Sequence, residues 1–449
     1  MNMSYLRLVV AGIAVLVLSG CASYGVIANK ASSGQQEAAE YSVRAHKASA
    51  TNSDLSLNLA FSGGGTRAAA FAYGIMLELR DTKVTINGKT GSMLDQVDSI
   101  SSVSGGSFTA AYYGLHGDGM FETFEEVFLR YDIEKQLVRQ VLNPFHWFGR
   151  KGRTERAIEY YDKKIFHGAT YADMVQQGRP LIVINASDLA YGVRFSFLQE
   201  YFDLLCSDLM TFPVSRAVTA SSAVPIVFNP VVVENHPDCK DQEIALMEKI
   251  RQRVSEGHDA ELNLLAEGLE SYADKDQRKY IHFVDGGITD NMGLRAMYDL
   301  VSISGGPEAY ITQVNAKLPS KLAVISIDAS TSPVYEMDET NKQPSIAHSI
   351  GALSGVQLHR YNAATLELIE TALYDWQDAL AEDGQTMTPY MVEINFEGIK
   401  QLEARQFFNK VPTSFSLSDE EVDKLIEAGR QLLRDHPVFQ QLVADLNSG

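Results

Sequence analysis

The sequence is poor in cysteine and basic residues. Only three of its 449 residues are cysteines, no Cys-x-x-Cys motif occurs and the ten histidines are scattered, so a zinc-type site is not expected. Asp and Glu outnumber Lys and Arg by 57 to 38, the formal net charge is −19, and no basic stripe is evident. These features argue against a nucleic-acid partner. A composition of 45% hydrophobic and 21% charged residues is otherwise that of an ordinary globular protein.

The N-terminus carries an apolar run that is too short to span a bilayer as a helix. This run, Leu8–Leu18, fits the central region of a secretory signal. The following "LSGC" (18–21) resembles the lipobox of bacterial lipoproteins, which implies a signal peptide over 1–20 and lipidation of Cys21. Ala22 in place of Asp then implies the outer membrane for a Gram-negative lipoprotein. The alternative is a plain signal peptide with a chance cysteine.

The remaining cysteines, Cys206 and Cys239, leave a disulfide open. An exported chain meets an oxidising compartment in which the two could pair. Spacing alone does not decide whether their geometry allows a bond. We expect two separate thiols.

Three regions follow the signal peptide. Residues 21–54 are rich in Ala, Ser, Gln and Glu, which predicts a flexible or loosely helical, lipidated tether. Residues 55–330 form the main domain, interrupted near 238–279 by charged segments with helical periodicity. Residues 331–449 are expected to pack on the same domain as an extension. Its last part contains Ser418 and Glu421, spaced as a helix capping box.

Apolar strands alternate with helices through the main domain. Strands are expected over 55–61, 96–103, 180–189, 280–287, 321–330 and 389–396, helices over 66–80 and 105–116, and a helix end, turn and strand over 217–233. This alternation predicts an α/β fold with a mixed central sheet flanked by helices.

The stretch "SSVSGGS" (101–107) marks a junction between a strand and a helix. Ser104 lies at the turn, the position of a nucleophile elbow, where a sharp turn exposes a serine Oγ above the sheet. The elbow needs small residues two positions before and after the nucleophile, and Ser102 and Gly106 meet that need. Serine replaces the usual first glycine of G-x-S-x-G, so Ser101, Ser102 and Ser107 remain competitors. The bland alternative is a structural serine in a glycine-rich turn.

A serine nucleophile needs a base, and no histidine stands in a recognisable triad context. Asp285 follows an apolar strand and precedes two glycines in "IHFVDGG", so its carboxylate is the predicted base. An aspartate serves this role when it lies within hydrogen-bonding reach in a partly desolvated site. His282 in the same strand is interpreted as an ordinary side chain, and the alternative for Asp285 is a turn former.

The third motif is "SGGGTR" (62–67), between a strand and a helix. The amides of Gly63, Gly64 and Gly65 are predicted to form an oxyanion hole, because side chains there would block access to them. A phosphate-binding loop is the alternative, but the spacing and the lysine of that motif are missing. Arg67 either steadies the loop or contacts a lipid phosphate.

Together these motifs resemble the patatin-like phospholipase family, over roughly residues 55–330. The segment "ASSAVPIVFNPV" (220–231) is also similar to the family, and the tail from Val411 to Leu433 is similar to that of some bacterial members. The resemblance implies a three-layer fold, a Ser104–Asp285 dyad, an oxyanion hole at Gly63–Gly65, and hydrolysis of lipid acyl esters without a metal or other cofactor.

The function predicted from the sequence is a serine lipid acyl hydrolase anchored to the bacterial outer membrane, with membrane lipids as substrate. Two alternatives stay open: a hydrolase of small esters or thioesters with the same fold, and a catalytically silent lipid-binding envelope protein. Residues 143–153 mix aromatic and basic side chains, and they either dock on lipid headgroups, cover the site, or form a partly packed loop with a solvated basic end. The sequence leaves the oligomeric state open.

Overall fold

The computed structural model describes residues 24–32, 40–49, 54–132, 152–177, 180–225, 227–237, 248, 250–253, 260–332, 340–382 and 384–448. The predicted signal peptide, Cys21, Cys239 and residues 143–151 of the aromatic and basic stretch lie outside these ranges, as does most of 238–259.

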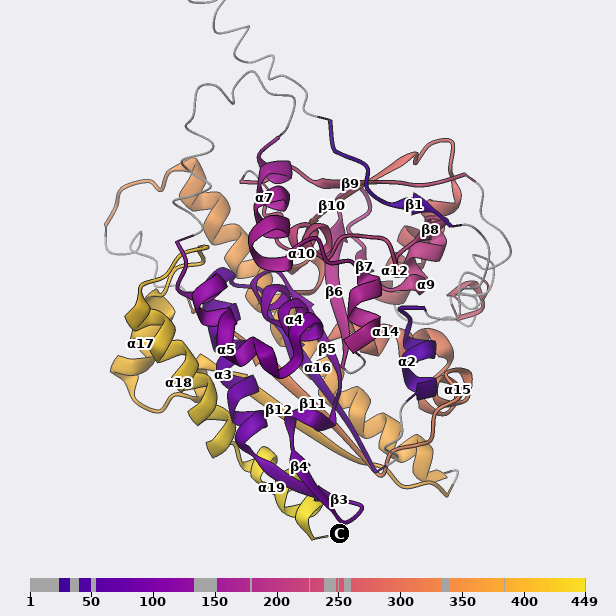
Figure 1. Ribbon diagram of the computed structural model, residues 1–449, viewed down its shortest axis with the longest axis vertical. Coiled ribbons are helices and arrows are strands. Elements are labelled where there is room, and N and C mark those ends of the chain that lie inside the picture. Colours follow the sequence, from indigo (N-terminus) through magenta and orange to yellow (C-terminus); the bar gives the residue numbers. More distant parts are fainter. Residues whose placement is uncertain are drawn as a thin grey trace, which may run out of the picture.

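An eight-stranded mixed sheet forms the centre of the molecule, with β12, β11, β2, β5, β6, β10 and β9 in spatial order and β7 beside β6 (Figure 1). From β12 to β6 neighbouring strands are parallel, whereas β10 is antiparallel to β6 and β9. The bounds are β2 (Leu55–Phe61), β5 (Val97–Val103), β6 (Leu181–Asp188), β7 (Arg194–Ser196), β9 (Val231–Glu234), β10 (Tyr280–Asp285), β11 (Lys321–Asp328) and β12 (Thr388–Asn395). The predicted mixed α/β sheet is therefore confirmed.

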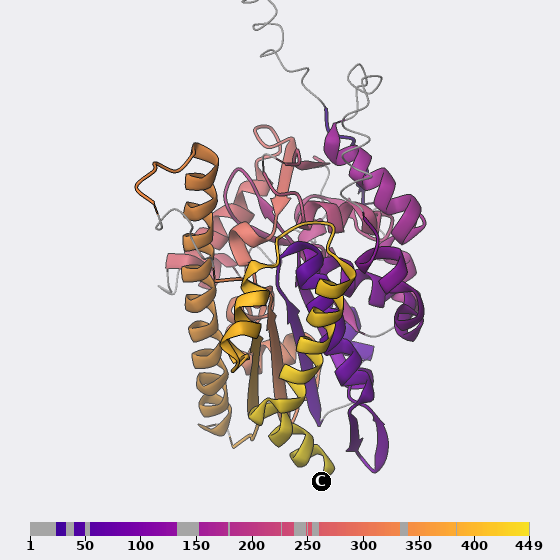
Figure 2. The ribbon, with the colours of Figure 1, turned by 90° about the vertical axis from the view of Figure 1, so that its left-hand side faces the viewer.

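Helices cover both faces of this sheet, as Figure 2 shows edge-on. One face contacts α3 (Gly65–Asp81), α4 (Gly105–His116) and α10 (Val214–Ser221). On the other side lie α13 (Gly287–Asp290), α14 (Arg295–Ser304), α15 (Pro307–Gln313) and the 37-residue α16 (Ile346–Glu382). The apolar β2, β5 and β6 are buried along nearly their whole length, as expected for parallel strands covered twice.

The segment predicted as a flexible tether is folded onto the domain where the structure describes it. β1 (Lys30–Ala31) pairs antiparallel with β8 (Ser207–Asp208), and the buried Asn29 donates hydrogen bonds to Ser207 and Glu234. Farther on, α2 (Val43–Ser49) begins with the Val43 amide donating to Glu200. The structure thus contradicts a flexible tether for residues 24–32 and 40–49, because specific hydrogen bonds offset the entropic cost of ordering these residues. Helix α2 agrees with the helical alternative.

Cys206, close to β8, forms a disulfide bond whose partner lies outside the described residues. The expectation of a free thiol at this position is therefore wrong.

The C-terminal extension packs against the main domain. Its helix α18 (Asp419–Asp435) begins with the predicted capping box: Ser418 accepts from the Glu421 amide, and Glu421 accepts from the Ser418 amide. α18 lies along α3, where Glu78 accepts hydrogen bonds from Arg430 and Arg434. Helices α17 (Leu402–Lys410) and α19 (Pro437–Asn447) complete this side of the molecule (Figure 1).

A hairpin after α3 is among the elements that the sequence analysis does not predict. β3 (Lys83–Ile86) and β4 (Lys89–Ser92) form a hairpin around Asn87-Gly88, both with positive φ, as in a type I′ turn. The described part of the predicted insertion contains α12 (Ala260–Glu270), in agreement with its helical periodicity.

Candidate active site

Ser104 stands at a sharp turn between the end of β5 and the start of α4. Its φ of 50° and ψ of −120° lie outside the regions that a non-glycine residue normally occupies. Such backbone strain persists only where the surroundings fix it, and it is concentrated at functional sites. The predicted elbow is present in this conformation.

The elbow packs directly on the glycine-rich loop. A Cβ atom on Gly105 would lie 2.0 Å from the carbonyl oxygen of Gly65, so only glycine allows this approach. Ser102, which replaces the usual first glycine of the motif, is accommodated because its Oγ donates to the Val183 carbonyl of the neighbouring β6. The departure from G-x-S-x-G therefore does not disturb the turn.

The structure brings Ser104 and Asp285 together from 181 positions apart. Ser104 Oγ donates a hydrogen bond of 2.9 Å to Asp285 Oδ2, and the Gly287 amide donates to Asp285 Oδ1 at 2.8 Å. Both side chains are buried. Burial raises the pKa of Asp285 to about 6, although the hydrogen bonds from Gly287 and Ser104 act in the opposite direction. A carboxylate with such a pKa is a stronger base than an exposed aspartate.

Ser221 supports this pair, although the sequence analysis assigns it no role. Its Oγ accepts a 2.8 Å hydrogen bond from the Ser104 amide and donates to the Asn185 carbonyl at 2.6 Å. Ser187 Oγ similarly donates to the Asp285 carbonyl at 2.8 Å. Ser221 lies within the family-like segment 220–231, which was the only available signal for it.

The three glycines of the loop are not equivalent. The Gly63 amide donates to the Asn291 carbonyl at 3.0 Å, so the prediction of three available donors is wrong for Gly63. Among the described residues, the Gly64 and Gly65 amides have no hydrogen-bond acceptor, and both residues have positive φ. Gly65 also begins α3, so the positive end of that helix lies at the loop. These two amides remain as donors for an oxyanion.

Residues 59–298 match the family model described as patatin-like phospholipase. The chain belongs to the patatin-like phospholipase family. The matched region contains the glycine-rich loop, Ser104 and Asp285, and membership in this family supports lipid ester hydrolysis as the general class of activity.

Solved structures of human GIVD cytosolic phospholipase A2 are similar to this patatin-like chain. One has 9% sequence identity and a TM-score of 0.40, covering 88% of this chain and 62% of its own. Another, in complex with methyl gamma-linolenyl fluorophosphonate, has 11% identity and a TM-score of 0.38, covering 88% and 59%. This chain therefore spans less than two thirds of the length of these structures. No curated protein matches it in sequence.

Arg67 of the patatin-like domain is buried and held by backbone carbonyls. Its Nε donates to Ala329 at 2.8 Å and its Nη1 to Val411 at 2.7 Å, while burial lowers its pKa to about 10. It thus ties the glycine-rich loop to the end of β11 and to the C-terminal extension. Of the two predicted roles, steadying the loop is the one that these contacts favour over contact with a lipid phosphate.

His282 is exposed on β10, in agreement with its interpretation as an ordinary side chain. Within the described ranges, no three His, Cys, Asp or Glu side chains are grouped as a metal site requires. No helix in these ranges has the length and apolar character to cross a bilayer.

Proposed function

We propose that the protein is a serine lipid acyl hydrolase in which Ser104 is the nucleophile and Asp285 the base. The observation that carries this proposal is the 2.9 Å hydrogen bond from Ser104 Oγ to Asp285 Oδ2 at a strained elbow. A nucleophile within hydrogen-bonding reach of its base is the arrangement that acyl transfer requires.

The reaction proceeds in two halves. Ser104 Oγ attacks the ester carbonyl as Asp285 accepts its proton, and collapse of the tetrahedral intermediate releases the alcohol, which takes that proton. Water then attacks the acyl-enzyme, again losing a proton to Asp285, and breakdown returns the proton to Ser104 with release of the carboxylic acid. The Gly64 and Gly65 amides and the N-terminus of α3 stabilise the oxyanion of each intermediate.

We also propose that the protein is lipidated at Cys21 and lies on the bacterial outer membrane. The first described residues support a productive orientation. Gly25 contacts Val232 of β9, and the Val26 amide donates to Glu155 of α7 (Arg153–Tyr161), at the same end of the sheet as the dyad (Figure 1). Cys21 precedes Tyr24 by three residues, so at most about 11 Å of extended chain would separate the proposed lipidation site from Tyr24.

Exposed apolar side chains surround the same end. They follow β6, precede β9, begin β10 or follow Asp285: Leu189, Tyr191, Val224, Val227, Tyr280 and Ile288. Apolar groups on a surface close to an acylated terminus favour contact with a bilayer. A membrane ester would then approach the dyad directly.

The test is release of free fatty acid from phospholipid vesicles by the wild type and by Ser104→Ala. We expect release by the wild type alone. Turnover of short-chain esters without any release from varied lipids would favour the small-ester alternative. Lipid retention without turnover, unchanged in Ser104→Ala, would favour the silent envelope protein.

A further inference from the structure

A cavity of about 420 Å³ lies at the opposite end of the sheet from Ser104. It opens between the amino ends of the parallel strands and the helices α14, α15 and α16, and its volume falls in the range typical of small-molecule sites, about 300–1,000 Å³. Ser99 of β5 lines it, whereas Ser104 is five residues farther along. At the rise of a strand this separates the two by about 16 Å, so the cavity is not the acyl site of the dyad.

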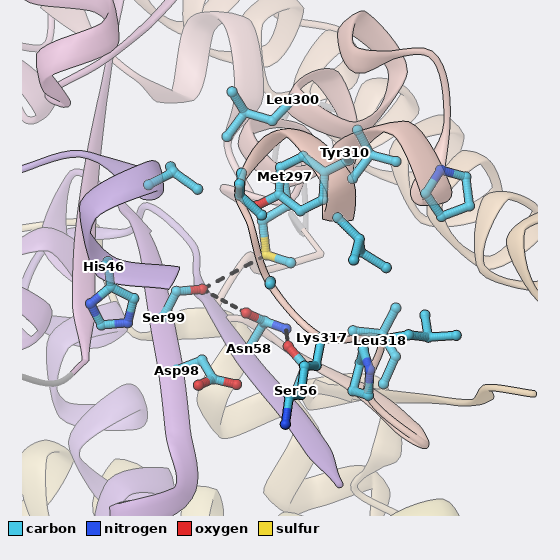
Figure 3. Close-up of a pocket in the computed structure, with 18 of the residues that line it drawn as sticks. His46, Ser56, Asn58, Asp98, Ser99, Met297, Leu300, Tyr310, Lys317 and Leu318 are labelled. Atoms are coloured by element: carbon cyan, nitrogen blue, oxygen red, sulfur yellow. Dashed lines mark hydrogen bonds between the residues drawn. The ribbon is translucent and has the colours of Figure 1, made fainter. Parts of the chain in front are cut away.

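The cavity has an apolar side and a polar side (Figure 3). Leu300 and Tyr310 on the helices, together with Trp376 of α16, form part of the apolar side. On the strands, Ser99 Oγ donates to Asn58 Oδ1 at 2.8 Å, and Asn58 Nδ2 donates to Ser56 Oγ at 3.2 Å.

The polar side carries an acidic group. Asp98 lines the cavity beside Ser99, is 4% exposed, and accepts a hydrogen bond from the Leu57 amide at 3.1 Å. Among the described lining residues the one Lys or Arg is Lys317, which is exposed at the rim. His46 also lines the cavity. A carboxylate ligand placed against Asp98 would meet a group of like charge, whereas a hydroxyl group would donate a hydrogen bond to the oxygens of Asp98.

We propose that this cavity binds a single-chain lipid with a neutral, hydroxyl-bearing head, of the monoacylglycerol or alkylglycerol class. The head lies against Asp98, Ser99 and Asn58, and the chain lies among α14, α15 and α16. A largely apolar cavity with a few convergent polar groups is the usual form of such a site. Binding here does not require chemistry at Ser104, so a failure of the proposed hydrolase activity leaves the proposal separately testable.

The chain supplies its own reporter for the test. It has two tryptophans, Trp147 and Trp376, and only Trp376 lines the cavity among the described residues. In a Trp147→Phe background, Trp376 fluorescence is titrated with a medium-chain alkylglycerol, whose ether bond resists ester hydrolysis, and with the fatty acid of the same chain length. We expect a saturable change with the alkylglycerol and several-fold weaker binding of the fatty acid.

Two variants locate the ligand, with calorimetry as the readout. Leu300→Trp fills the cavity and should weaken alkylglycerol binding roughly tenfold, as displacement of about two methylenes implies, whereas Leu402→Trp on the exposed face of α17 should not. Asp98→Asn retains the shape of the cavity wall but removes its charge. This variant should therefore show a smaller difference in affinity between the alkylglycerol and the fatty acid. Unfolding midpoints establish that each variant is folded.

The proposal would be overturned if Trp376 fluorescence did not change on titration with the alkylglycerol. It would also be overturned if folded Leu300→Trp bound the alkylglycerol as tightly as the protein with Leu300. Tighter binding of the fatty acid that is lost in Lys317→Ala would overturn it as well, because that result places a charged head at the rim.

Discussion

The carboxyl end and the amino end of the central sheet differ in their structure. At the carboxyl end, β5 stops in a strained turn, and polar side chains from β5, α10 and β10 are linked by hydrogen bonds around Ser104 and Asp285. At the amino end, the same strands and helices from far along the chain leave a cavity between them. The strained turn, the candidate nucleophile and the candidate base therefore lie together at the carboxyl end, as backbone strain and shifted pKa values do at functional sites.

Among the variants considered, Asp285→Asn at the carboxyl end of the sheet should cause the largest loss of ester turnover. The amide keeps the side-chain shape but cannot accept the proton, so ester turnover should fall by about 10²–10⁴-fold. Steady-state turnover of a soluble ester measures this. Asp276→Asn, at an exposed aspartate, is the control and should leave turnover unchanged. Full turnover by Asp285→Asn would remove the base from the account.

Gly65→Ala should have the next largest effect on activity. Gly65 has a φ of 62°, and a Cβ atom there would lie 2.4 Å from the Ser414 carbonyl oxygen, so the loop must shift. A displacement of about 1 Å in a catalytic group costs roughly a hundredfold in rate. The comparison is kcat/KM of the variant against that of Gly88→Ala.

Gly88 is a matched control because its φ is 72° and no atom within 4 Å would meet its Cβ. Gly88→Ala should lower the unfolding temperature through backbone strain while retaining activity. Equal losses of activity in both variants would show that general destabilisation, rather than the position of the loop, is responsible.

The dependence of kcat/KM on pH should follow the ionisation of the buried Asp285 carboxyl group. Burial raises the pKa of Asp285 to about 6, and only the ionised form accepts a proton. Thus kcat/KM should reach a plateau above pH 6 and fall about tenfold per pH unit below it. The measurement is kcat/KM on a soluble ester across the acid range. A plateau that extends unchanged to pH 4 would contradict the pKa assigned here.

The smallest expected effect concerns the membrane end. A flexible Gly/Ser insertion between Cys21 and Tyr24 lengthens the reach of the proposed anchor and should lower turnover of vesicle lipids a few-fold, because it loosens the orientation of the dyad. Turnover of a soluble ester should not change. The lipidated full chain is assayed on both substrates. If the ratio of vesicle-lipid turnover to soluble-ester turnover is the same with and without the insertion, anchor length has no role.

How far the sequence predicts this molecule follows from how local each signal is. The strand from Leu55 to Phe61 and the elbow at Ser104 lie within short stretches whose pattern fixes their conformation, and both were predicted. The hairpin at Asn87-Gly88 has an equally local signal, the Asn-Gly pair between two short strands, which the sequence analysis does not use.

The remainder depends on contacts between distant segments. Three features join residues that no rule of sequence spacing connects. They are the hydrogen bond from the Gly63 amide to Asn291, the hydrogen bond from Asn29 to Ser207, and the cavity between β5 and α14. The composition of residues 21–54 favours a tether because their polar side chains cannot form a core alone. In the described part of this range, however, the domain supplies hydrogen-bond partners, as for Asn29 and Val43.

The central claim is that Ser104 is a nucleophile activated by Asp285, and labelling with a fluorophosphonate probe tests it most directly. The probe is applied to the folded wild type, Ser104→Ala, Asp285→Asn and the neighbouring Ser102→Ala. The account predicts labelling of the wild type and Ser102→Ala, none of Ser104→Ala, and strongly slowed labelling of Asp285→Asn. Labelling that survives in Ser104→Ala would contradict it.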